Sequence, residues 1–237
     1  MQDGHRITRP TIKGWGRAEI FLAGWCTLAL LTLIPATVLL RGSTPIFTVV
    51  WLSVALFVLA RTRDASHLGF QRISGKNYLF ATAVNLALVA LAMAIAESRT
   101  HTYRYLLTEA LSNPRPDTTF AWLARFPGVA GLLGMFLYAS FVTIFAEELF
   151  FRGLLLHSLQ NSLGRWPAIL MQAALFTIPN GIVVLFLPVI QGATYGLVYT
   201  FLAIGVAGGW SAARTQSIWP SLTTAALINL ILTIIVI

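Results

Sequence analysis

The stretch Phe145-Ala-Glu-Glu-Leu-Phe-Phe-Arg-Gly153 places three charges inside an apolar run that begins near Val129. An apolar run of about 20 residues is long enough to cross a membrane as a helix. Ionisable side chains within such a helix are costly to desolvate, and they mark a functional site by default. This stretch therefore predicts a membrane-embedded helix that carries a functional centre.

The whole chain has the composition of a membrane protein. Of its 237 residues, 57% are hydrophobic and 10% are charged, and the mean hydropathy is +0.77. So few polar side chains cannot cover a water-soluble globule of this size. The formal charge of +8 comes from basic residues scattered singly between apolar runs, which favours a role in membrane orientation. We therefore expect contact with membrane lipid and no nucleic-acid partner.

Apolar runs of spanning length predict an all-α fold, a polytopic membrane helix bundle of about seven transmembrane helices. The predicted spans are residues 18–41, 45–61, 78–97, 128–151, 166–187, 195–213 and 217–237. Three glycines and Pro188 interrupt the apolar pattern across 181–200, which predicts a broken or re-entrant helix there. Residues 103–111 are expected to form a short interfacial helix.

Basic residues on alternate sides of these spans predict the orientation. Eleven Lys and Arg residues, Arg152 among them, fall on one side, and five fall on the other. The richer side is expected to be cytoplasmic, so the N-terminus lies inside and residues 1–17 form a cytoplasmic basic tail. We predict one integral membrane domain over 1–237, multi-pass and located in a bacterial cytoplasmic membrane.

The charged cluster is expected towards the cytoplasmic end of the fourth span. Arg152 follows Glu148 by four residues, so the two share a helical face and can form an ion pair. Glu147 points about 100° away around the helix and has no partner nearby in the sequence. A carboxylate of this kind can act as a general base. A structural ion-pair cluster that fixes helix packing fits the same spacing, so both interpretations stay open.

These residues, together with those downstream, resemble the CPBP family of CAAX-type intramembrane endopeptidases and bacteriocin-processing or immunity proteins. Residues 147–153 look like its EExxxR motif, Phe176 to Asn180 align with FxxxH, and Ala225 to Asn229 fall on HxxxN. The resemblance covers about 135–235. It implies that the catalytic motif positions are held here by Glu147, Glu148, Arg152, Asn180 and Asn229.

The resemblance also implies chemistry for which this sequence lacks two side chains. In active members the first Glu and the motif-two His are thought to activate a water, or a metal with its water, while the motif-three His and Asn stabilise the oxyanion. Here position 180 is Asn and position 225 is Ala. An amide cannot accept a proton near neutral pH and binds zinc poorly. We therefore predict an impaired protease with no cofactor and no zinc.

Three functions are compatible with these residues. The favoured one is a catalytically impaired protease homologue that binds a peptide segment or another integral membrane protein, as a scaffold or accessory subunit of a membrane complex. The second is an active glutamate-dependent endopeptidase, of the CAAX prenyl or bacteriocin-processing type. The third, an ion or proton-coupled transporter, is disfavoured because the charge is confined to one helix end and no inverted repeat is visible.

Two further features of the sequence lead to structural predictions. His157, ten residues after Glu147, is expected as an interfacial polar residue and not as a substitute catalytic histidine. Gly205 and Gly209 form a small-xxx-small step, which predicts close packing against a neighbouring helix, more simply within the chain than with a partner.

Overall fold

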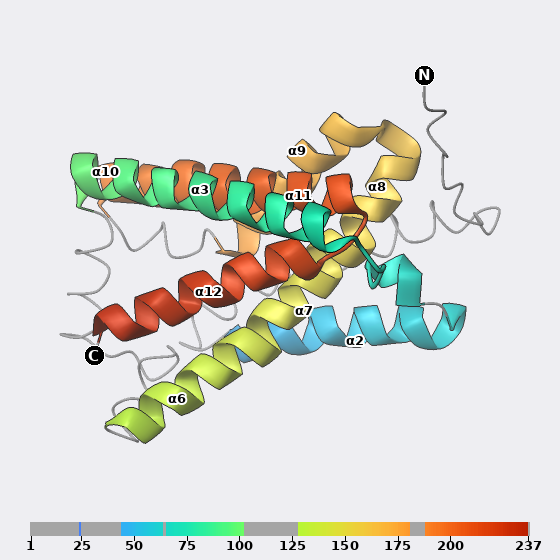
Figure 1. Cartoon of the computed structure of the whole chain (residues 1–237), viewed down its shortest axis with the longest axis horizontal. Helices are drawn as coiled ribbons and strands as arrows, with labels where there is room; N and C mark the ends of the chain where they lie inside the picture. Colours follow the sequence, from blue (N-terminus) through green and yellow to red (C-terminus); the bar gives the residue numbers. More distant parts are fainter. Residues whose placement is uncertain (1–23, 25–43, 64, 102–127, 181–187, 237) are drawn as a thin grey trace.

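The computed structural model describes residues 24, 44–63, 65–101, 128–180 and 188–236 (Figure 1). Over these residues the chain forms a helix bundle without strands, which confirms the all-α fold. Three helices are long and apolar enough to cross a membrane: Gly75–Thr100, Val129–Leu163 and Val189–Thr215. The predicted span 18–41, except Gly24, and the predicted interfacial helix at 103–111 lie outside the described residues, so the count of seven spans stays a prediction.

Among the described residues, helices α2 and α3 precede the segment with the motifs. Helix α2 spans Thr44–Thr62, a 3-10 turn, η1, spans Ala65–Leu68, and α3 spans Gly75–Thr100. Ser74 caps α3, because its hydroxyl accepts a hydrogen bond from the Asn77 N–H at 3.4 Å and so satisfies one amide at the helix start. With 26 residues, α3 is about 39 Å long, which exceeds the roughly 30 Å hydrocarbon core of a membrane.

One long helix, the 129–163 helix, carries the charged cluster. It consists of α6 (Val129–Tyr138), η2 (Ala139–Ile144), α7 (Phe145–Glu147), η3 (Glu148–Leu155) and α8 (Leu156–Leu163). Figure 1 shows it crossing the bundle obliquely. Both η2 and η3 are π-helical, and such widened turns frequently occur at functional sites. Gly164 ends the helix with φ +79°, a conformation that glycine adopts without steric cost.

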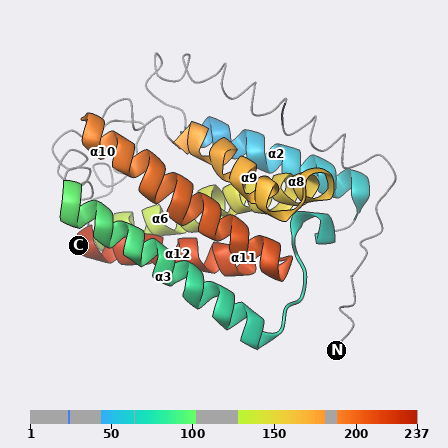
Figure 2. The ribbon, with the colours of Figure 1, turned by 90° about the horizontal axis from the view of Figure 1, so that it is seen from above.

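The remaining helices complete the bundle. Helix α9 spans Arg165–Asn180. The 189–215 helix consists of α10 (Val189–Ala193), the π-helical η5 (Thr194–Val206) and α11 (Ala207–Thr215), and α12 spans Trp219–Val236. The 189–215 helix packs between α9 and α3, and α12 packs against α3 and α11. Seen from above, α2 and α3 lie on opposite sides of the bundle (Figure 2).

An aromatic core holds α2 and α9 against η3. The ring centroid of Trp51, on α2, lies 5.3 Å from that of Phe151 and 6.4 Å from that of Phe150. Phe151 in turn lies 5.2 Å from Phe176 of α9, edge to face. Such ring pairs stabilise by about 0.5–1.5 kcal/mol each beyond the burial of their area. They fix the helix that bears the charges at the centre of the bundle.

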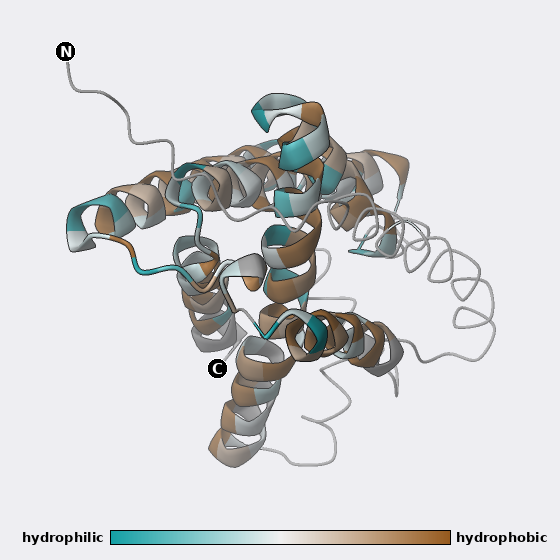
Figure 3. Ribbon diagram, turned by 90° about the vertical axis from the view of Figure 1, so that its right-hand side faces the viewer, coloured by the Kyte–Doolittle hydropathy of each residue, from teal (hydrophilic) through white to brown (hydrophobic). Residues whose placement is uncertain are grey.

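The outer faces of the helices are apolar as well. Phe57, Leu79 and Phe141 are 59%, 67% and 69% exposed, and Figure 3 shows hydrophobic residues along the outward faces of several helices. Apolar surface on this scale is unfavourable in water and is typical of contact with lipid. Together with the three long apolar helices, it indicates an integral membrane protein.

The helix that contains the predicted fourth span, 128–151, continues beyond that span to Leu163. Its polar residues His157 and Ser158 are buried. Glu147 and Glu148 therefore lie near the middle of the helix and not at its cytoplasmic end. Arg152, which was counted as a cytoplasmic loop residue, is wholly buried within the same helix.

The helix break predicted across 181–200 is also wrong where the structure describes it. The 189–215 helix starts directly after Pro188, and Gly192 and Gly196 lie buried inside it. A helix in lipid keeps its backbone hydrogen bonds internal, so small residues that face a neighbouring helix do not interrupt it. Residues 181–187 lie outside the described part.

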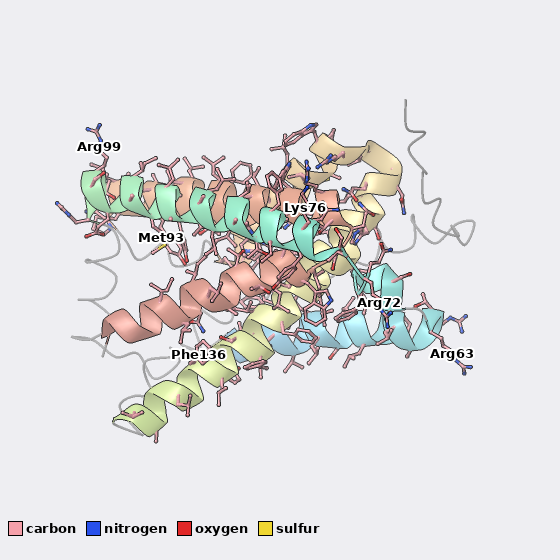
Figure 4. All side chains as sticks on the ribbon, in the orientation of Figure 1. Arg63, Arg72, Lys76, Met93, Arg99 and Phe136 are labelled. Atoms are coloured by element: carbon pink, nitrogen blue, oxygen red, sulfur yellow. The ribbon has the colours of Figure 1, made fainter. Side chains whose placement is uncertain are left out.

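Four of the basic residues that the structure describes lie in keeping with the predicted sides, whereas Arg152 is buried inside the bundle. Arg63, Arg72 and Lys76 lie towards one end of the bundle, and Arg99 lies at the opposite end (Figure 4). The first three belong to the side predicted to be cytoplasmic and Arg99 to the other side. Which side faces the cytoplasm stays a prediction.

Gly153 is a point of close approach between η3 and η1. A Cβ at Gly153 would lie 2.5 Å from the backbone oxygen of Leu68. Gly153→Ala should therefore lower the thermal unfolding temperature in mild detergent, at a cost of about 1–3 kcal/mol for overpacking. Gly134→Ala is the matched control, since a Cβ there meets nothing within 4 Å. Equal unfolding temperatures for the two variants would contradict the close approach.

Candidate functional site

A cavity of about 190 Å³ lies between the 129–163 helix, α9, the 189–215 helix, α12 and α3. Four of the five residues predicted for the site line it, namely Glu147, Glu148, Asn180 and Asn229. Ala225, which stands where the third motif has a histidine, lines it as well. Three sequence motifs that are far apart in the chain therefore meet around one space within the bundle.

Arg152, the fifth predicted residue, lies beside this cavity and does not line it. Its Nη1 lies 3.5 Å from Oε1 of Glu148, which confirms the ion pair expected one turn apart on the helix. Nη2 donates a hydrogen bond to the Ile204 carbonyl at 2.9 Å, and Cζ lies 4.1 Å from the ring centroid of Phe176. The guanidinium thus joins η3 to both α9 and η5.

Glu148 is buried and is held through both carboxylate oxygens. While Oε1 faces Arg152, Oε2 accepts a hydrogen bond from the Ser221 hydroxyl at 2.5 Å. The sequence analysis gave Ser221 no role. The signal that could have found it is its position four and eight residues before Ala225 and Asn229, which places all three on one face of α12.

Glu147 faces the cavity from α7 and is only partly buried. Among the described residues Arg152 forms its ion pair with Glu148, one residue further along. The Glu147 carboxyl group shares the cavity with Asn180, whose Nδ2 donates a hydrogen bond to the Phe176 carbonyl at 3.0 Å. Glu147 is therefore the carboxylate in this cluster that can interact with a ligand.

Asn229 enters the cavity from α12. Its Nδ2 donates a hydrogen bond to the Ser140 hydroxyl at 2.9 Å, which ties α12 to η2. In this arrangement one amide donor is bound to the protein itself, and the side chain is held in a fixed position at the cavity wall. Ala225, one turn earlier on the same helix, contributes only a methyl group to that wall.

Four further residues of the cavity wall were not predicted from the sequence. They are Asn85 of α3 and three residues of η5, Tyr195, Tyr199 and Thr200. Helix α3 lies outside the motif region, so the resemblance could not find Asn85. A single amide within the apolar run 78–97 was the available signal, because polar groups at membrane depth seldom lack a function.

His157 does not supply a missing histidine. It is buried, contrary to the expectation of an interfacial residue, because its ring packs near Gly69 and its Nδ1 lies 2.5 Å from the Gly153 carbonyl. It does not line the cavity.

The predicted close packing within the chain at Gly205 and Gly209 is confirmed. A Cβ at Gly205 would lie 2.9 Å from Cβ of Ala173, and one at Gly209 would lie 2.6 Å from Oε1 of Gln172. Both neighbours belong to α9. The two glycines thus let the 189–215 helix approach α9 closely.

The donor atoms around the cavity do not fit a zinc ion. Over the described residues no group of three or more His, Cys, Asp or Glu side chains is placed to hold a metal. Glu148 is already bound by Arg152 and Ser221, which leaves Glu147 and amide groups. Protein zinc sites use histidine, cysteine and carboxylate ligands, and amides at positions 180 and 229 are no replacement.

Replacing one residue of the buried ion pair should destabilise the fold more than replacing both residues. Arg152→Met leaves the Glu148 carboxylate without its charged partner, and we expect a loss of about 3–5 kcal/mol. The double variant Arg152→Met/Glu148→Leu removes both charges and should recover most of that loss. Thermal unfolding in detergent measures both variants. A double variant no more stable than the Arg152→Met single would contradict the pairing.

Residues 129–231 match the family described as type II CAAX prenyl endopeptidase Rce1-like. The matched segment includes every helix that lines the cavity except α3. It confirms the CPBP resemblance that the motifs over 135–235 predict. Comparisons with curated proteins and with solved structures found no match.

Proposed function

Because residues 129–231 match the Rce1-like family of CAAX prenyl endopeptidases, we propose that this protein is a CPBP-type homologue that binds a peptide segment in its intramembrane cavity without hydrolysing it efficiently. In this proposal it acts as a binding or accessory subunit for a membrane-embedded polypeptide. Hydrolysis of the peptide bond is slow, while the cavity still binds a peptide.

The observation that carries the proposal is the identity of the side chains around the cavity. Asn180 and Ala225 stand at the two positions where the motifs have histidines, and both line the cavity with Glu147. An Asn amide can orient a water molecule but cannot take its proton, and a methyl group stabilises no oxyanion. Loss of one oxyanion donor reduces a rate by about 10²–10³, and loss of a general acid or base costs about 10²–10⁴.

The same side chains support binding. The cavity combines hydrogen-bonding groups, Glu147 and Asn180, with apolar walls that include Val89 and Ile228. Cavities that combine apolar walls with a few placed polar groups are typical ligand sites. Since the guanidinium of Arg152 is bound to Glu148 and to a backbone carbonyl, the cavity favours a neutral main-chain segment over an anionic group.

The alternative is an active glutamate-dependent endopeptidase. It is supported by Glu147, which faces the cavity next to Asn180 and has no ion pair among the described residues. In this alternative Glu147 removes a proton from a water molecule that Asn180 orients, and Asn229 donates to the carbonyl oxygen of the substrate. It requires that cleavage depend on Glu147.

Photo-cross-linking tests the binding proposal. A diazirine amino acid at position 225 should label with a farnesylated CAAX peptide when the full chain is reconstituted in lipid nanodiscs. Position 79 is the matched control, since Leu79 is 67% exposed on the outside of α3 and reports only partitioning into lipid. Excess unlabelled peptide should suppress labelling at position 225 and not at 79. Equal labelling at the two positions, or none at 225, would contradict the proposal.

A further inference from the structure

The cavity contains an amide that the family motifs do not include. Asn85 lies on α3, before the segment that matches the family, and lines the same cavity as Glu147 and Asn180. Its side chain is only 3% exposed. A residue so placed faces the same ligand as the motif residues but comes from a different helix.

The side chain of Asn85 has no hydrogen-bond partner among the described residues. Its Oδ1 is buried and accepts no hydrogen bond. Its Nδ2 donates no hydrogen bond to a described residue either. The two other amides of the cavity differ, since Asn180 donates to the Phe176 carbonyl and Asn229 to the Ser140 hydroxyl. Asn85 therefore keeps both a donor and an acceptor for a bound molecule.

A buried amide without hydrogen-bond partners carries an energetic cost, because its donor and acceptor have lost water without gaining a protein group in exchange. A ligand that brings both a donor and an acceptor removes it. A peptide group does so with its N–H and its C=O, and this matches the Asn side chain whichever way its amide is turned.

The surroundings of Asn85 define the neighbouring side chain of such a ligand. Val89, one turn further along α3, lines the cavity together with Tyr199 and Ile228. All three belong to one buried apolar cluster. A main-chain group bound at Asn85 would thus place an adjacent aliphatic side chain against this cluster.

We propose that Asn85 is a peptide-binding residue, pairing with one main-chain amide of an uncharged, extended segment whose neighbouring side chain is aliphatic. This inference rests on the proposed binding function and adds a recognition element from α3. It assigns to α3 a residue that holds the peptide in register within the cavity that Glu147 also lines.

The cross-linking assay from position 225, titrated with the farnesylated peptide in nanodiscs, tests this inference. Asn85→Leu keeps the side-chain volume and removes both hydrogen-bonding groups. The peptide concentration that gives half-maximal labelling should rise about tenfold, the value of one lost hydrogen bond. The unfolding temperature without peptide should stay equal or rise, because an unpartnered amide has been removed. A merely structural role for Asn85 would lower it.

Thr82→Val is the matched control. Thr82 is one turn earlier on α3 and has a buried hydroxyl without a partner, but it does not line the cavity. The peptide concentration that gives half-maximal labelling of Thr82→Val should equal that of the wild type. Tight labelling of wild type and Asn85→Leu alike would overturn this inference and leave the proposed function standing. Absence of saturable labelling in the wild type would overturn the proposed function, and this inference with it.

A series of peptides, each methylated at one main-chain nitrogen, identifies the group that Asn85 binds. One member of the series should lose affinity for the wild type and bind Asn85→Leu no worse than the unmethylated peptide does. If every methylated peptide loses affinity by the same factor for the wild type and for Asn85→Leu, Asn85 does not pair with the main chain and the inference is wrong.

Discussion

The buried Arg152–Glu148 ion pair is the constraint on which the rest of the site depends. A guanidinium at membrane depth is tolerated only if its partners are close and well placed. Arg152 finds them in Glu148, the Ile204 carbonyl and the Phe176 ring, and so it fixes η3 relative to α9 and η5. Gly208 belongs to the same arrangement, since a Cβ there would lie 3.3 Å from Nη2 of Arg152.

This pair determines what the cavity can do. Because Arg152 and Ser221 hold Glu148, the two adjacent glutamates differ: Glu148 is bound through both carboxylate oxygens, and Glu147 has no ion pair among the described residues. Where the motifs have two imidazoles, the cavity that Glu147 faces has the Asn180 amide and the Ala225 methyl group. Amides form good hydrogen bonds to a peptide but do not carry protons. The proposed function, binding a polypeptide without cleaving it efficiently, rests on this difference.

Much of this could be predicted from the sequence, and the failures have physical causes. The motif spacing predicted that Glu147, Asn180 and Asn229 meet, and the i, i+4 spacing predicted the Arg152–Glu148 pair. Apolarity alone could not place the end of the 129–163 helix, because His157 and Ser158 are polar yet buried. Nor could it show that Asn85 faces the cavity, since that depends on how α3 packs against η5 and α12.

We propose that the cavity still binds a peptide and that the protein no longer hydrolyses it efficiently. The most direct test is mass spectrometry of a farnesylated CAAX peptide incubated with excess protein in nanodiscs, with Glu147→Ala measured in parallel. The account predicts intact peptide, with any slow cleavage equal for the wild type and the variant. Cleavage that the wild type performs and Glu147→Ala does not would contradict it and establish an active endopeptidase.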